Sequence, residues 1–100
     1  MLDWVRLKTA SKDLAQLKGA SPTRPITMAE LENHNSQFDG WIVLHGAVYN
    51  VSPYVPYHPG GAKIFLPVLG KDATKEFDKF HRWVNISGLI GSLKIGVIVP

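Results

Sequence analysis

The clearest pattern of hydrophobic and polar positions lies near the middle of the chain. Two short runs of apolar, β-branched and aromatic residues, Trp41–Leu44 and Ala47–Val51, are separated only by His45 and Gly46. Runs of this composition favour β-strands, and a two-residue break that contains Gly is typical of a hairpin turn. We therefore predict an antiparallel hairpin with His45 exposed to solvent at its turn.

Short helices are predicted on both sides of this hairpin. The capping residues Thr27, Ser52 and Asp72 each stand where a helix can begin, and Thr27 has a Glu three residues later, as in a capping box. Gly70 is a typical helix end, whereas Pro67 marks a kink or an early stop. The expected helices are Thr27 to about His34, Tyr54–Tyr57, Ala62–Leu69, Ala73–Lys79 and Asn85–Ile90.

The two ends of the chain differ in character. The apolar run Leu93–Ile98 predicts a closing strand. Residues 1–25 have only a weak apolar pattern and end in a stretch rich in Ser and Pro, which indicates an N-terminal arm that packs loosely or not at all. One hundred residues are enough for one hydrophobic core, so we expect a single domain over residues 26–100.

Composition narrows the chemistry. The chain has no cysteine, which excludes disulfides, thiolate zinc sites, iron–sulfur clusters and thioether-linked haem. Its net charge of +3 comes from scattered Lys and Arg, so we expect no nucleic-acid partner. No apolar stretch approaches the ~20 residues that span a bilayer, and residues 1–7 lack an apolar signal core. We expect a soluble protein without a membrane segment.

Two histidines are the candidate ligands of the chain. His58 begins a His-Pro-Gly-Gly motif, and His81 follows a predicted helix in which Phe77 and Phe80 share one face. Pro59 fixes the backbone beside the first histidine, and the glycines leave room for a flat macrocycle to pass closely. Two neutral imidazoles on separate segments, surrounded by apolar side chains, suit a haem iron held from both faces.

Other interpretations of these histidines stay open at this point. A histidine before Pro-Gly-Gly is commonly a turn residue whose ring is merely hydrogen-bonded. A zinc site would need four ligands, and the nearby carboxylates Asp72, Glu76 and Asp78 do not have a zinc-like spacing. The second histidine and the aromatic face beside it favour haem.

Residues 26–98 resemble the cytochrome b5 haem-binding domain. The resemblance rests on the hairpin at residues 41–51, the His-Pro-Gly-Gly motif at 58–61 and the segment from Gly70 to Phe77. It implies an α+β fold of cytochrome b5 type, in which a small mixed sheet and short helices form a haem pocket. It also implies that His58 and His81 bind the iron axially, and that the cofactor is non-covalent haem b, iron protoporphyrin IX.

The family's pocket can be carried onto this chain residue by residue, although plain core packing explains each single apolar residue equally well. Leu93 is expected beside Leu89 at the pocket floor. Arg82 is a candidate partner of a haem propionate, because its planar guanidinium can pair with a carboxylate. The expected cofactor-binding residues are Leu44, Val51, Tyr54, Pro59, Ile64, Phe65, Phe77, Phe80, Arg82 and Leu89.

Two departures from the common microsomal form refine this resemblance. The interval between the histidines is one residue shorter, and the missing residue lies between Phe77 and His81. In this respect the chain is similar to the haem domain of soluble cytochrome b5 oxidoreductases, where that domain is fused to a reductase. Residues 58–85 hold five Lys or Arg against three Asp or Glu, whereas microsomal domains surround the haem edge with carboxylates. We therefore expect a redox partner with a more acidic face.

The resemblance implies a carrier of single electrons between a flavin-containing reductase and an acceptor protein. With both axial positions filled, oxygen binding and peroxidase chemistry are disfavoured, so we do not expect an enzyme. We expect a cytoplasmic monomer that reaches the endoplasmic reticulum only through partners. Two alternatives are a haem-binding or ligand-binding adaptor without redox turnover, and a subunit that acts only when joined to a flavin protein.

Overall fold

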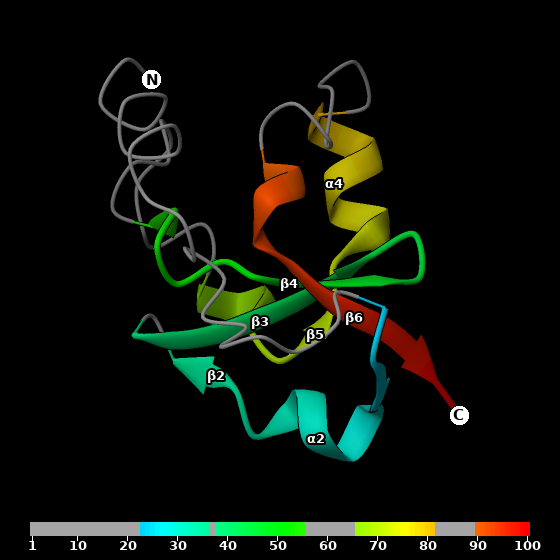
Figure 1. Ribbon diagram of the computed structural model, residues 1–100. Helices are drawn as coiled ribbons and strands as arrows, with labels where there is room; N and C mark the ends of the chain where they lie inside the picture. Colours follow the sequence, from blue (N-terminus) through cyan, green and yellow to red (C-terminus); the bar gives the residue numbers. More distant parts are fainter. Residues whose placement is uncertain (1–22, 37, 56–65, 82–89) are drawn as a thin grey trace.

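The computed structural model describes residues 23–36, 38–55, 66–81 and 90–100. A curved sheet crosses the middle of the molecule (Figure 1). The helix α4 (Thr74–His81) and the 3₁₀-helix η3 (Gly91–Leu93) stand on one side of this sheet, and the helix α2 (Met28–Glu32) lies on the other. The sheet therefore separates two packing layers, which confirms the α+β class.

The sheet is mixed, as the resemblance implied. Its strands follow the order β1-β6-β4-β3-β2, and β5 also pairs with β3. The pairs β1/β6 and β3/β5 are parallel, whereas the other pairs are antiparallel. The strands are β1 (Pro25–Thr27), β2 (Asn35–Ser36), β3 (Asp39–Leu44), β4 (Ala47–Asn50), β5 (Lys71–Asp72) and β6 (Lys94–Val99).

The predicted hairpin is confirmed as β3 and β4. Leu44 pairs with Ala47, so the connection consists of His45 and Gly46 alone. Both have positive φ, 50° and 83°, which is the conformation of a type I′ turn and matches the right-handed twist of the two strands. His45 is exposed, as expected. The predicted closing strand is confirmed as β6.

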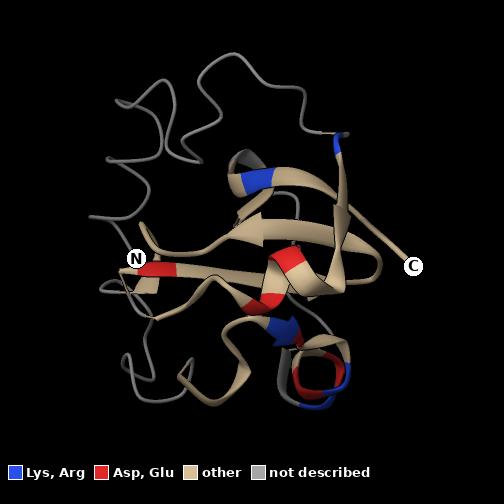
Figure 2. Ribbon diagram, turned by 90° about the horizontal axis from the view of Figure 1, so that it is seen from below, with Lys and Arg blue, Asp and Glu red and all other residues tan. Residues whose placement is uncertain are grey.

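The helix α2 begins at the predicted cap. Thr27 Oγ1 accepts a hydrogen bond of 3.2 Å from the backbone N–H of Glu30, and the helix ends at Asn33, slightly earlier than expected. In a capping box the Glu side chain would accept a hydrogen bond from the backbone N–H of the cap residue. Here the Glu30 carboxylate instead accepts two bonds of 3.1 and 3.0 Å from the guanidinium of Arg24. This pair ties the chain before β1 to the helix that faces the reader in Figure 2.

The helix α4 also begins as predicted and runs two residues further than expected. Asp72 Oδ1 accepts hydrogen bonds from the backbone N–H and the hydroxyl of Thr74, at 3.0 and 2.6 Å. Before it, residues Leu66–Val68 form the 3₁₀-helix η2 instead of the end of an α-helix, and the chain then turns at Gly70 with φ of 77°. Pro67, which lacks a backbone N–H, cannot contribute an α-helical hydrogen bond there.

Some predicted helices fall partly outside the described residues. Of the expected Tyr54–Tyr57 helix, only its start is described, where the N–H groups of Tyr54 and Val55 both donate to the carbonyl of Val51. Of Asn85–Ile90, only Ile90 is described. Within the described part of the chain, no helix is long and apolar enough to cross a membrane.

The two faces of the sheet bury two separate hydrophobic clusters. Alternation along β3 sends Ile42 and Leu44 to one face and Val43 to the other. The smaller cluster, which packs against α2, consists of Ile26, Leu31, Val43, Val48 and Ile95 with Trp41 and Ile98 at its edge. The larger cluster lies on the side of α4 and η3, and it contains the described part of the candidate site.

Candidate functional site

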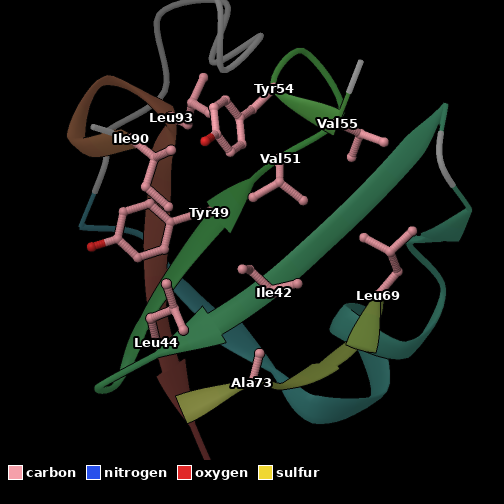
Figure 3. Packing of buried hydrophobic residues seen from close by; sticks show 10 residues of the cluster. All are labelled: Ile42, Leu44, Tyr49, Val51, Tyr54, Val55, Leu69, Ala73, Ile90 and Leu93. Carbon is pink, nitrogen blue, oxygen red and sulfur yellow. The ribbon is translucent and has the colours of Figure 1, made fainter. Parts of the chain in front are cut away.

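The larger cluster is a continuous apolar wall over β3 and β4 (Figure 3). Strand alternation supplies its centre, because Ile42 and Leu44 in β3 face the same side as Tyr49 in β4 and Val51 just after it. Segments from later in the chain complete its edges, with Leu69 and Ala73 flanking β5. The buried members are Ile42, Leu44, Tyr49, Val51, Tyr54, Val55, Leu69, Ala73, Ile90 and Leu93.

Every expected pocket residue whose side chain is described belongs to this wall or packs on it. Leu44, Val51 and Tyr54 are buried within it, and Phe77 of α4 packs against it from above. Leu93, expected at the pocket floor, is fully buried in the same cluster. The structure thus brings together side chains from β3, the end of β4, α4 and η3.

A small hydrogen-bonded polar cluster follows β4, in the part of the sequence that leads to the first candidate ligand. The Ser52 hydroxyl accepts a hydrogen bond of 2.8 Å from the backbone N–H of Gly40 and donates one of 2.8 Å to Oδ1 of Asn50. Asn50 is only 5% exposed, so this polar cluster is part of the interior. It fixes the turn from Val51 to Val55, the last described residue before His58.

Comparison with known proteins identifies the family. The model of the family described as "Cytochrome b5-like Heme/Steroid binding domain" matches residues 27–99, nearly three quarters of the chain. The chain belongs to this family.

Relatives of this cytochrome b5-like chain differ in length. Cytochrome b5 reductase 4 of Homo sapiens is 44% identical over 96 residues, which cover 96% of this chain and 18% of the relative. The chain therefore spans about a fifth of the length of that relative. A protein of Schizosaccharomyces pombe, named an uncharacterized heme-binding protein, is 40% identical over 97% of this chain and 65% of its own length.

A solved structure confirms the cytochrome b5 fold. The cytochrome b5 of Ostreococcus tauri virus 2 superimposes with a TM-score of 0.67 and 33% sequence identity, covering 74% of this chain and 95% of the viral protein. The matched architecture is the mixed sheet with short helices described above, so the fold expected from the resemblance is confirmed.

The two motif histidines and part of the expected pocket lie beyond what the structure describes. His81 is the last residue of α4, but its side chain and that of Phe80 are outside the described set. The ligand and cofactor roles of these residues are therefore predictions. The predicted residues that lie entirely outside the described ranges are His58, Pro59, Ile64, Phe65, Arg82 and Leu89.

The described wall fits an apolar cofactor. Among the described residues, no buried side-chain nitrogen or oxygen lacks a hydrogen-bond partner, so the wall presents no polar group that demands another ligand chemistry. Two tyrosines, Tyr49 and Tyr54, supply aromatic surface, and burial raises the pKa of both above the ordinary value of 10.0. A flat hydrophobic macrocycle is compatible with this lining, and imidazole is a suitable donor for its iron.

Several members of the wall were not among the expected site residues. Ile42 and Tyr49 were missed although each lies two positions from a predicted pocket residue, Leu44 and Val51 respectively. Because side chains of a strand alternate between its faces, this two-residue spacing was a usable signal. Val55, Leu69, Ala73 and Ile90 had no comparable signal.

The described part of the rim carries balanced charge. Lys71, Lys75 and Lys79 alternate with Asp72, Glu76 and Asp78 along β5 and α4, and Figure 2 shows both colours on α4. The expected excess of positive charge therefore rests on Lys63 and Arg82, which lie outside the described residues.

Proposed function

We propose that this cytochrome b5-like chain is an electron carrier that holds non-covalent haem b between His58 and His81. The observation that carries the proposal is the convergence of Leu44, Val51 and Phe77 on one apolar wall, next to the helix that ends at His81. The match to the family over residues 27–99 supports it, because that range contains both histidines.

The chain's own residues would hold the cofactor and exclude water from it. Apolar side chains from β3, β4 and α4 would lower the polarity around the macrocycle, and the imidazoles of His58 and His81 would hold its iron. Bound haem supplies a one-electron redox couple. With no open coordination position, the site suits electron transfer better than oxygen chemistry, and the chain acts as a carrier instead of an enzyme.

We infer that the electron donor is a flavin-containing reductase and that a second protein accepts the electron. The likeness to cytochrome b5 reductase 4 supports a link to a reductase, since the chain matches a small part of that longer protein. Balanced charge over β5 and α4 favours a partner surface of mixed charge at this part of the rim, with the acidic complement placed near Lys63 and Arg82.

A second candidate function is ligand binding without redox turnover. The family description names steroids beside haem, and an apolar wall could also hold a flat polycyclic ligand. The pair of histidines favours haem, because a steroid has no use for two metal ligands.

An absorption spectrum of the chain with added haem tests the proposal. We expect a sharp low-spin reduced spectrum that carbon monoxide does not alter, because His58 and His81 would both hold the iron as strong protein ligands. His58→Ala and His81→Ala should each yield five-coordinate or weakly held haem. Leu66→Ala is the matched control, because this side chain is exposed on η2 and should leave the spectrum unchanged.

Two results would reject the carrier assignment. One is no haem uptake by the wild-type chain, which would favour the ligand-binding alternative. The other is retention of the wild-type spectrum by both histidine variants, which would place the ligands elsewhere.

A further inference from the structure

The hairpin turn and α4 are joined by two hydrogen bonds that both involve His45. Its ring atom Nε2 lies 2.9 Å from Oδ1 of Asp78, so the ring N–H donates to the carboxylate. Its backbone N–H donates to Oγ1 of Thr74 at 3.0 Å. These contacts link residues about thirty positions apart. The sequence pattern predicted only that His45 is exposed at the turn.

The Thr74 hydroxyl transmits this contact to the start of the helix. It accepts from His45 and donates to Asp72 Oδ1 at 2.6 Å, so both its donor and its acceptor capacity are used. The residue before it is also tied to the sheet, because the backbone N–H of Ala73 donates to the carbonyl of Val43. The first turn of α4 is therefore attached to both strand β3 and the tip of the hairpin.

The anchored positions follow one face of α4. Thr74, Phe77 and Asp78 have the spacing i, i+3 and i+4, and His81 is the seventh residue after Thr74, which continues the same register. A helix of eight residues is marginal by itself in water, so its position depends on such tertiary contacts. The contacts occupy its first two turns, and the predicted ligand ends its last turn.

We propose that His45 is a positioning residue that fixes α4 against the hairpin and thereby sets the place of His81. This inference rests on the proposed function, because it assigns a purpose to His45 in haem retention. His45 does not contact the cofactor in this scheme. It acts through Asp78 and Thr74, and its loss allows the end of α4 to move away from the pocket more often.

A substitution can separate this role from the role of His45 in the turn. His45 has φ of 50°, a conformation that Asn also adopts readily in type I′ turns. His45→Asn therefore keeps a suitable turn residue and the backbone bond to Thr74, but its short side chain cannot reach Asp78. His45→Gln restores a longer side chain with an N–H donor at its end.

The test is the rate at which the haem-loaded protein loses haem to excess apomyoglobin. His45→Asn and Asp78→Ala should each lose haem about two- to fivefold faster than wild type, because a half-exposed pair contributes only modestly. The double variant should be no faster than either single variant, since both remove the same contact. His45→Gln should lie close to wild type.

Asp39→Ala is the matched control, because it removes the acceptor of a different His–Asp pair. Asp39 forms the other described His–Asp pair, with His34 at 2.7 Å, but that pair lies at β2 and β3 and not on α4. Its variant should leave haem loss unchanged even where it lowers the urea midpoint, which distinguishes positioning from general stability. Wild-type rates in both His45→Asn and Asp78→Ala would overturn the proposal.

Failure of the proposed function is recognisable separately. If the wild-type chain takes up no haem, the role in haem retention is rejected together with the carrier assignment. Amide hydrogen exchange in the cofactor-free chain then decides whether the contact still holds α4. Faster exchange over residues 77–81 in His45→Asn, but not in Asp39→Ala, would support the anchoring step, and equal exchange would reject it.

Discussion

Tyr54 packs in the apolar wall and also carries a titratable hydroxyl group. It is only 3% exposed, and burial raises its pKa because the phenolate form is poorly solvated there. A group whose pKa is higher in the folded state than in the unfolded state makes its full contribution to stability when the pH is below its pKa in the unfolded chain. That contribution is lost as the pH rises through the pKa of the group in the folded protein.

We therefore predict alkaline destabilisation that depends on Tyr54. The urea midpoint of the wild-type chain should fall between about pH 9 and about pH 11, on either side of the usual tyrosine pKa. Tyr54→Phe should lose less stability over this interval, since Phe cannot ionise. Surface lysines titrate equally in both proteins, so the difference between the two curves isolates Tyr54. Parallel curves would contradict the prediction.

Among the elements, the parallel pair of β1 and β6 is one contact that the sequence pattern did not predict. Gly96 in β6 permits it, because a Cβ at this position would meet the backbone carbonyl of Arg24 and lie 2.7 Å from Cδ1 of Ile26. The same carbonyl accepts a hydrogen bond from the N–H of Val97 at 2.9 Å. A side chain at position 96 would thus push against backbone, which cannot move aside by changing a rotamer.

Gly96→Ala should lower the free energy of unfolding by about 1 to 3 kcal/mol, the usual cost of overpacking. Urea unfolding gives the magnitude, and amide exchange at Val97 gives the location. Gly46→Ala is an informative comparison, because nothing lies within 4 Å of its Cβ and its cost should come from the positive φ of 83°. It should loosen the hairpin turn and leave β1 and β6 paired. Unchanged stability of Gly96→Ala would show that β1 shifts freely.

For the molecule as a whole, the sheet divides the interior into two clusters with different dependence on a cofactor. The smaller cluster is closed by α2, through the fully buried Leu31, and by β1, through Ile26. The larger cluster contains the wall of the proposed haem pocket. If haem packs against the larger cluster, its removal loosens the packing of that cluster and leaves the smaller one unchanged.

Haem removal should accordingly lower protection from amide exchange on one side of the sheet. We expect faster exchange at α4 and at Tyr54 in the cofactor-free chain, while Val43 and Val48 remain protected. Haem at a thousand times its dissociation constant should also raise the free energy of unfolding by about 4 kcal/mol, which shifts the urea midpoint upward. Equal loss of protection on both faces would contradict this division.

The local sequence was sufficient for the hairpin, for the start of α2 and for the start of α4. Each depends on neighbours within a few residues: alternating side chains around His45-Gly46, a hydroxyl at Thr27 and a carboxylate at Asp72. The family resemblance further indicated Leu44, Val51 and Tyr54 as members of one wall. The structure confirms their common packing, whereas the ligand roles of His58 and His81 remain predictions.

Tertiary structure alone decided the pairing of β1 with β6, the bonds from Arg24 to Glu30 and the contact between His45 and Asp78. The strands β1, β2 and β5 have two or three residues each, too few to display an alternating pattern. Exposed polar residues such as His45 carry no periodic signal that names a distant partner. Local propensity is determined by neighbouring residues, but contacts between distant segments exist only once the sheet has brought those segments together.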